Sequence, residues 1–183
     1  MRRAPAHLTT VRAAHLVRRF FGSLRPGGPG RDEQSWAEAQ LLPTEAALWR
    51  DLPAADRRHS AAVARRVEAM LGPAATRPVL AAALLHDVGK TASGLGTPGR
   101  VVATLASLTV VRTPADVERW SRATGVRWYI GTYLRHPEIG ARLLVGAGSD
   151  PLTVAWTLEH HRPAGRCTLD PVVADALRRA DDD

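Results

Sequence analysis

Cysteine and lysine are almost absent from this 183-residue chain, which has one of each. The single cysteine, Cys167, cannot form an internal disulfide and has no second cysteine with which to build a zinc site, so we expect a reducing, cytoplasmic environment. Because Lys90 is the only lysine, arginine carries nearly all of the positive charge behind the formal net charge of +7. No apolar run reaches the roughly 18 residues of a membrane-spanning helix, so none is predicted.

The excess of arginine has two interpretations. A GC-rich genome raises arginine and alanine content together, and this explanation requires no ligand. Alternatively, the guanidinium groups attract phosphate-bearing ligands, which arginine binds in a bidentate manner. The charge alone does not decide between them.

Length and composition predict one globular domain preceded by a basic segment. A chain of 183 residues with 45% hydrophobic residues can bury one substantial core. Residues 1–30 form a basic N-terminal segment and linker, ending in a proline- and glycine-rich break, and residues 31–183 form the domain. The basic segment lacks the features of a secretory signal. It permits contact with a membrane surface or nucleic acid, although packing on the domain is the commoner outcome for such a segment.

The domain is predicted to be all-α, a compact multi-helix bundle. Apolar residues recur at helical spacing, and no segment shows sustained alternation with period two. Trp36 and Trp49 are expected to anchor the first helices to the core, and Trp128 and Tyr129 are assigned to the core in preference to a substrate wall. Helices are predicted over residues 32–42, 43–52, 56–71, 78–88, 100–111, from 114, 136–145, 151–161 and from 171, with a loop over 93–100 near the site entrance.

Residues 83–90 carry the strongest chemical signal, because an apolar helix ends there in His86, Asp87, Gly89 and Lys90. Charged groups at the end of a buried segment are costly unless something satisfies them, and a divalent metal does so. Adjacent helical residues diverge by about 100°, so His86 and Asp87 share one ion only at a helix end, or else flank two ions. Asp87 has two oxygens and is the candidate bridging ligand. Gly89 is expected to turn the chain.

Five of the seven histidines lie on or beside predicted apolar helices. Taken singly, a histidine is more often an ordinary buried or surface residue than a metal ligand. Together the five could converge within one bundle. They are His59, His86, His136, His160 and His161.

The order of these residues, followed by a late aspartate, resembles that of the HD-domain superfamily of metal-dependent phosphohydrolases. The resemblance covers about residues 55–183 and depends on His-Asp-Val-Gly-Lys at 86–90, His-Pro-x-x-Gly at 136–140 and the paired histidines at 160–161. These motifs are most similar to the branch that includes the cyclic-dinucleotide phosphodiesterases with a Gly-Tyr-Pro motif. That motif is replaced here by Arg-Pro-Ala-Gly-Arg-Cys at 162–167, so nothing specific points to cyclic di-GMP.

The resemblance implies a centre of two divalent ions, with Asp87 bridging them. Nitrogen and oxygen ligands suit Fe, Mn, Zn, Ni or Co, which the sequence does not rank. Two ions about 3.5 to 4 Å apart would polarise a phosphoryl group and activate a water. Asp181 is favoured over Asp175 as the last ligand because of its Ala-Asp context. The implied ligands are His59, His86, Asp87 and Asp181 for the first ion, and Asp87, His136, His160 and His161 for the second.

The leading functional prediction is a metal-dependent phosphohydrolase that acts on a nucleotide-like or other small phosphoester. Asp87 and Lys90 are its candidate catalytic residues, and Lys90 would steady the phosphate. Two alternatives stay open: a non-catalytic regulatory or binding module that keeps the metal, and a di-iron oxygenase on the same ligand set. Oxygen uptake under reducing conditions would separate the oxygenase from the hydrolase.

Overall fold

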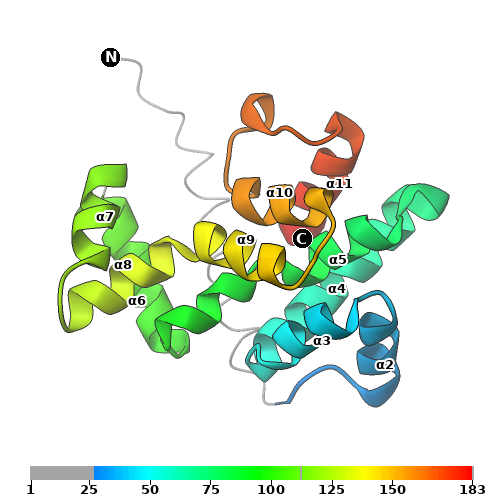
Figure 1. The fold of residues 1–183 in the computed structure, drawn as a ribbon, viewed down its shortest axis with the longest axis horizontal. Helices are drawn as coiled ribbons and strands as arrows, with labels where there is room; N and C mark the ends of the chain where they lie inside the picture. The colour runs from blue at the N-terminus through cyan, green and yellow to red at the C-terminus, as the bar shows by residue number, and fades with distance from the viewer. Residues whose placement is uncertain (1–26, 112, 183) are drawn as a thin grey trace.

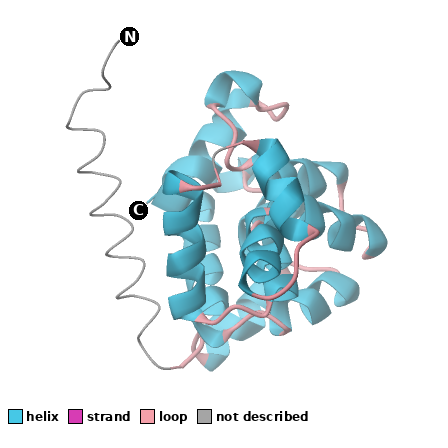
Figure 2. Cartoon of the chain, turned by 90° about the vertical axis from the view of Figure 1, so that its left-hand side faces the viewer, coloured by secondary structure: helices cyan, strands magenta, loops and turns pink. Residues whose placement is uncertain are grey.

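A computed structural model describes residues 27–111 and 113–182 of the chain. Within those ranges the chain forms ten α-helices and three short 3-10 helices with no strand, which confirms the all-α bundle (Figures 1 and 2). Of the basic segment predicted over 1–30, all but 27–30 lies outside the described residues. None of the helices described is both long and apolar enough to cross a membrane.

The helices follow one another with short connections. The α-helices are α2 (Arg31–Ala39), α3 (Pro43–Arg50), α4 (Ala54–Leu71), α5 (Arg77–Leu85), α6 (Thr97–Thr109), α7 (Pro114–Ser121), α8 (Val126–Leu134), α9 (His136–Gly146), α10 (Pro151–Glu159) and α11 (Pro171–Asp182). The 3-10 helices are η1 (Gly72–Ala74), η2 (Val88–Ser93) and η3 (Ala164–Arg166).

Side-chain caps at two helix starts match the predicted boundaries. Thr113 and Asp116 form a capping box at the start of α7. The side chain of Asp150 accepts a hydrogen bond of 2.8 Å from the backbone N–H of Leu152 at the start of α10. The helix predicted from residue 32 begins one residue earlier, with Gly30 as its N-cap and Asp32 inside its first turn in place of the capping position.

Two other predicted boundaries also differ from the structure. The apolar helix α5 ends at Leu85 and not near 88, so His86 and Asp87 follow its last turn. The loop expected over 93–100 is shorter, because η2 continues to Ser93 and α6 begins at Thr97. Helical periodicity places a helix well but marks its end poorly, since 3-10 turns continue the same hydrophobic pattern.

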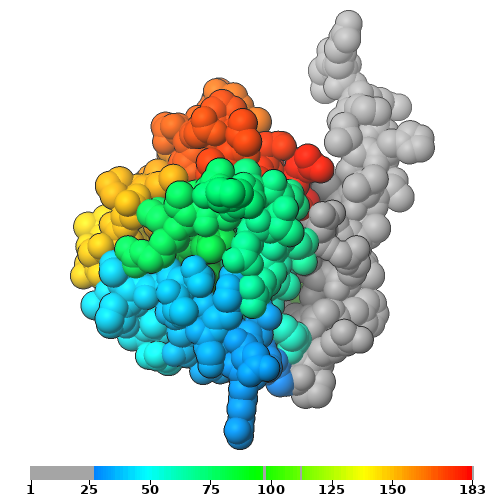
Figure 3. Space-filling model, turned by 90° about the vertical axis from the view of Figure 1, so that its right-hand side faces the viewer, coloured from blue at the N-terminus to red at the C-terminus, as the bar shows by residue number. Residues whose placement is uncertain are grey.

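The core surrounds α5, which packs against α3, α4 and α10. Every residue from 79 to 85 is buried, as the apolar sequence of this segment predicts. Burial of each leucine side chain contributes about 1.5 to 3 kcal/mol. Trp49 is fully buried and its Nε1 donates to Ser60 Oγ at 2.9 Å, which ties α3 to α4. The first described residues, in blue, and the last, in orange and red, lie on either side of the green middle part of the chain (Figure 3).

Helices α6, α7 and α8 form a separate group, here called the lobe, at one side of the bundle (Figure 1). Within the lobe α8 packs against both α6 and α7, and α8 also contacts η2. Trp128 and Tyr129 in α8 are 39% and 43% exposed, so their assignment to the core was wrong. The reason is that α8 is a short helix, and its buried residues are Ile130, Gly131 and Thr132.

Candidate metal centre

The predicted ligands converge where several helix ends meet. Helices α5, α10 and α11 end at this point, α9 begins there, and α4 supplies His59 from its second turn. The helix predicted from residue 56, which would have had His59 in its first turn, begins earlier, at Ala54. Because the C-terminal end of a helix carries partial negative charge, three of these ends favour a cation.

One group of ligands, the acidic half, consists of His59, His86 and Asp181. Their candidate ligand atoms all lie within 4.8 Å of one another. Asp181 Oδ1 lies 2.9 Å from His59 Nε2 and 3.6 Å from His86 Nε2. The alternative ligand Asp175 instead faces outward, with its side chain 63% exposed and 3.7 Å from Arg179. Asp181 is therefore the aspartate that the fold brings to the site.

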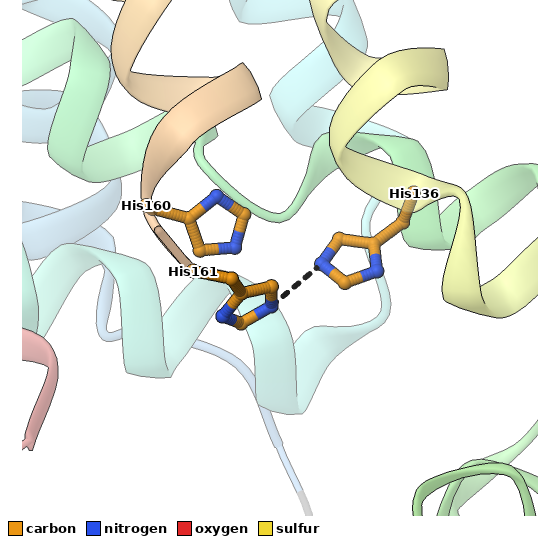
Figure 4. A group of neighbouring side chains, drawn as sticks. All are labelled: His136, His160 and His161. Atoms are coloured by element: carbon orange, nitrogen blue, oxygen red, sulfur yellow. Dashed lines mark hydrogen bonds between the residues drawn. The ribbon is translucent and has the colours of Figure 1, made fainter. Parts of the chain in front are cut away.

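The other group, the imidazole half, consists of His136, His160 and His161 (Figure 4). His136 approaches from the first residue of α9, and His160 and His161 follow the last turn of α10. His136 Nε2 and His161 Nε2 are 3.2 Å apart, and the rings of His160 and His161 have centroids 3.9 Å apart. His136 and His160 are buried and His161 is exposed, so His161 forms the rim of the site.

Asp87 lies between the two halves and faces both. Its Oδ2 lies 3.4 Å from His86 Nε2, on the acidic side. Its Oδ1 lies 3.5 Å from His136 Nε2 and 3.7 Å from His160 Nε2, on the imidazole side. One oxygen for each half is the arrangement that a bridging carboxylate requires.

Three of the imidazoles are oriented in the same way, by a backbone carbonyl three residues earlier. The Nδ1 atoms lie 2.8 to 2.9 Å from these carbonyls, so Nδ1–H is the donor and Nε2 keeps its lone pair toward the centre. Side-chain patterns gave no sign of these partners. The pairs are His86 with Ala83, His136 with Tyr133 and His160 with Thr157.

Two buried nitrogens show that the site fits a cation. The Nε2 atoms of His86 and His160 are both buried without a hydrogen-bond partner. An unsatisfied buried acceptor costs about 1 to 3 kcal/mol, and ligation to a metal would remove that cost. The ligand set of imidazole nitrogens and carboxylate oxygens, with no thiolate, is one that divalent transition metals accept.

The imidazole half is held in the neutral form that ligation needs. Burial, followed by the charge of Lys90, lowers the pKa of His136 well below its ordinary value. Burial and the neighbouring ring of His161 lower the pKa of His160 to about 3. Both rings therefore present unprotonated Nε2 atoms at neutral pH.

In the acidic half, the pKa of His86 shifts in the opposite direction. Burial would lower the pKa of His86, but the charges of Asp87 and Asp181 outweigh it and raise that pKa. Burial would raise the pKa of Asp87, but the charges of Lys90 and His86 hold that pKa well below its usual range. Asp87 is thus ionised throughout the neutral range.

Two motif glycines pack backbone against backbone and so bring the halves together. A Cβ on Gly89 would lie 2.0 Å from the His136 carbonyl oxygen and 2.6 Å from the Gly140 nitrogen. A Cβ on Gly140 would lie 2.8 Å from the methyl of Thr157. Gly89 lies in η2 without a positive φ, so the close approach of the His136 and Gly140 backbone, and not a left-handed turn, is what requires a glycine there. The motifs need these glycines because η2 and α9 touch there.

Lys90 lies beside the bridging carboxylate. Its Nζ forms an ion pair with Asp87 Oδ2 and lies 5.9 Å from the centroid of the Tyr133 ring. Its side chain is only 12% exposed. The ammonium group therefore lies within the site, next to the ring that lines the α8 side.

Two further contacts fix the chain near the exposed ligands. The buried carboxylate of Glu159 accepts hydrogen bonds from the backbone N–H of Thr168 at 2.7 Å and from its hydroxyl at 3.1 Å. This holds the loop that follows His161. Arg66 Nε donates to the carbonyl of Ala180 at 2.9 Å, which anchors the end of α11 beside Asp181.

The structure thus brings together all seven predicted ligands and Lys90. No family model, curated protein or solved structure matches the chain.

Proposed function

We propose that this protein is a metal-dependent phosphohydrolase of the HD type, acting on a nucleotide-like or other small phosphoester. The observation that carries the proposal is the placement of Asp87, with one oxygen toward each half and Lys90 on its acidic side. Two separate ligand groups joined by one carboxylate would suit a pair of divalent ions. Such ions polarise phosphoryl oxygens and lower the pKa of bound water.

The charge of the site favours an anionic substrate. The ligands contribute only two carboxylates, Asp87 and Asp181, so a pair of divalent ions would leave a net positive charge. Lys90 adds to it. A phosphate group provides the negative charge and the several oxygens that such a site lacks.

Different residues would have different roles in hydrolysis. Asp87 and the two halves would position the cations, and Lys90 would hold a phosphoryl oxygen against them. The attacking water would form a bond to phosphorus while the bond between phosphorus and the ester oxygen breaks. The proton that the water loses would end on that oxygen, which departs as an alcohol. Burial of Asp87 and His136 excludes bulk water from the inner side of the site, which strengthens these charge interactions.

The proposal is tested by metal analysis followed by a phosphoester screen. Protein purified with and without oxygen is analysed for bound metals, and a panel of mono- and diesters is then offered with the matching metal. We expect turnover that requires metal. The Lys90→Met variant should keep its metal and lose most of the turnover, because it removes the cation that holds the phosphate but no ligand.

The double variant His86→Ala, Asp87→Ala should lose both metal and turnover, and Asp175→Asn should change neither. A double variant that kept its metal and activity would refute the centre. Wild-type protein that bound metal but cleaved nothing in the panel would overturn the hydrolase in favour of a binding module. Metal-dependent oxygen uptake without phosphate release would favour the oxygenase.

A further inference from the structure

Helix α6 of the lobe turns small and polar side chains inward and larger apolar side chains outward, the reverse of the usual arrangement. Its inward face consists of small and polar side chains, among them the fully buried Ala103 and the partly buried Thr104 and Ser107. The hydroxyls of Thr104 and Ser107 donate to carbonyls of α6 itself at 2.9 and 2.7 Å, so they need no partner outside the helix. A surface helix ordinarily buries its larger apolar residues and exposes its small polar ones.

The outward face of α6 is a stripe of large apolar side chains. Val101, Leu105 and Leu108 follow one another at helical spacing, and Val102 lies beside them. Their exposed fractions are 37%, 56%, 58% and 52% respectively. Single exposed leucines are common, but a continuous stripe on one helix indicates a surface that is covered in function.

The lobe that carries this stripe has an excess of positive charge. Neither α6 nor α8 contains an acidic residue. Arg119 in α7 and Arg122, which directly follows α7, have side chains 69% and 76% exposed, and Arg127 in α8 is also exposed. The two acidic residues of the lobe are paired with Arg119 and Arg122 but leave arginine in excess.

Aromatic side chains accompany these arginines. Trp128 and Tyr129 are partly exposed in the first turn of α8, with ring centroids 5.0 Å apart. Tryptophan and tyrosine have an apolar body and a polar edge, which suits them to the boundary between lipid and water. Arginine, in turn, is attracted to anionic headgroups.

We propose that the lobe binds the surface of an anionic membrane, with the stripe Val101, Val102, Leu105 and Leu108 entering the headgroup region. An anionic surface matches both properties of the lobe, because it receives the apolar stripe and attracts the excess of arginine in the lobe. A second copy of the chain would cover the stripe but would bring two positively charged lobes together. The proposal is independent of the chemistry at the metal centre.

The test uses the full chain and two kinds of vesicle, one of phosphatidylcholine alone and one containing phosphatidylglycerol. We expect cosedimentation with the anionic vesicles that decreases as salt is added. The variant Leu105→Gln, Leu108→Gln should bind the anionic vesicles about tenfold more weakly or worse, because it removes most of the apolar stripe. Arg122→Gln, Arg127→Gln should also weaken binding to the anionic vesicles.

A matched control removes equally exposed apolar residues elsewhere. Val145 in α9 and Val172 in α11 are each 67% exposed, and Val145→Gln, Val172→Gln should bind as the wild type does. If the α6 variant binds as tightly as this control, another part of the chain makes the contact and the proposal is wrong. Failure to bind either vesicle, with self-association by sedimentation velocity that the α6 variant abolishes, would assign the stripe to a second copy.

Discussion

The two halves of the centre use the same imidazole chemistry but balance charge in opposite ways. In the acidic half, Asp181 lies 2.9 Å from His59, and the charges of Asp87 and Asp181 together raise the pKa of His86 against the effect of its burial. In the imidazole half no carboxylate belongs to the group itself, and burial lowers the pKa of His160 to about 3. The acidic half can therefore bind protons where the imidazole half excludes them.

This difference shows why Asp87 is the critical residue. It is the carboxylate that faces the imidazole half, through Oδ1, while its Oδ2 faces the acidic half and Lys90. The imidazole half has no carboxylate of its own, so its negative charge comes from Asp87, which directly precedes η2. A change at Asp87 acts on both halves, whereas a change at Asp181 acts on one.

The largest effect on metal binding is therefore expected from substitution of Asp87. Asp87→Asn should abolish high-affinity metal binding at both halves, whereas Asp181→Asn should remove one binding event and leave the other. The loss at Asp87 should exceed the roughly 10- to 100-fold typical of residues behind the ligands. Isothermal titration of chelator-treated protein, with Asp175→Asn as control, measures both stoichiometries. Equal losses in the Asp87 and Asp181 variants would show that the halves do not act separately.

A smaller effect is expected where the halves meet through their backbones. Gly89→Ala places a Cβ against the His136 carbonyl, and backbone cannot move aside, so the free energy of unfolding should fall by about 1 to 3 kcal/mol or more. Gly140→Ala would place a Cβ 2.8 Å from the methyl of Thr157 and 3.2 Å from the Gly89 nitrogen. Its closest contact is longer than the 2.0 Å contact at Gly89, so its loss should be smaller. Urea denaturation measures both. The reverse order of stability would show that η2 and α9 do not touch at these glycines.

The effect that is smallest per pH unit, because it is spread over several units, is a difference in the pH dependence of stability between the halves. The pKa of His160 falls from 6.5 to about 3 on folding, so between these values the unfolded chain binds a proton that the folded chain excludes. The stability of the metal-free protein should then decrease as pH falls through this window, by at most about 1.4 kcal/mol per pH unit for this ring. His160→Gln should flatten that decrease.

His86 changes the pH dependence of stability in the opposite direction. Its pKa is raised on folding, so its contribution is complete below pH 6.5 and is lost as pH rises through the folded value. His86→Gln should therefore remove part of the decline in stability on the alkaline side. Denaturation of chelator-treated protein at a series of acidic and alkaline pH values measures how the free energy of unfolding changes with pH in both variants. A pair of variants with identical pH profiles would contradict the contrast between the halves.

Much of the fold could be predicted from the sequence, because its periodicity and breakers are strong. The apolar run of α5, the stop at Gly72 and the caps at Thr113 and Asp150 all lie where local chemistry places them. The end of α5 was misplaced because η2 continues the buried pattern as 3-10 turns. The exposure of Trp128 depends on which helices pack together, and a single helix does not contain that information.

For the site, the sequence predicted which residues meet but not how they are held. The histidines and Asp181 converge as their order along the helices suggests. The contact between Gly89 and Gly140 was out of reach, because it joins segments about fifty residues apart and involves no side chain. The carbonyls that orient the rings belong to residues such as Ala83, whose side chains have no part in the chemistry.

Those carbonyls make the centre modular. Each of three imidazoles is oriented by the carbonyl of the residue three positions earlier. The direction of its Nε2 is therefore determined within a tetrapeptide and not by distant parts of the chain. Connecting segments can then lengthen or shorten without redirecting a ligand, provided that the helix ends still meet. An inserted group of helices between His86 and His136 is compatible with an intact centre for that reason, and the same tetrapeptides offer transferable parts for building imidazole sites on other helical frameworks.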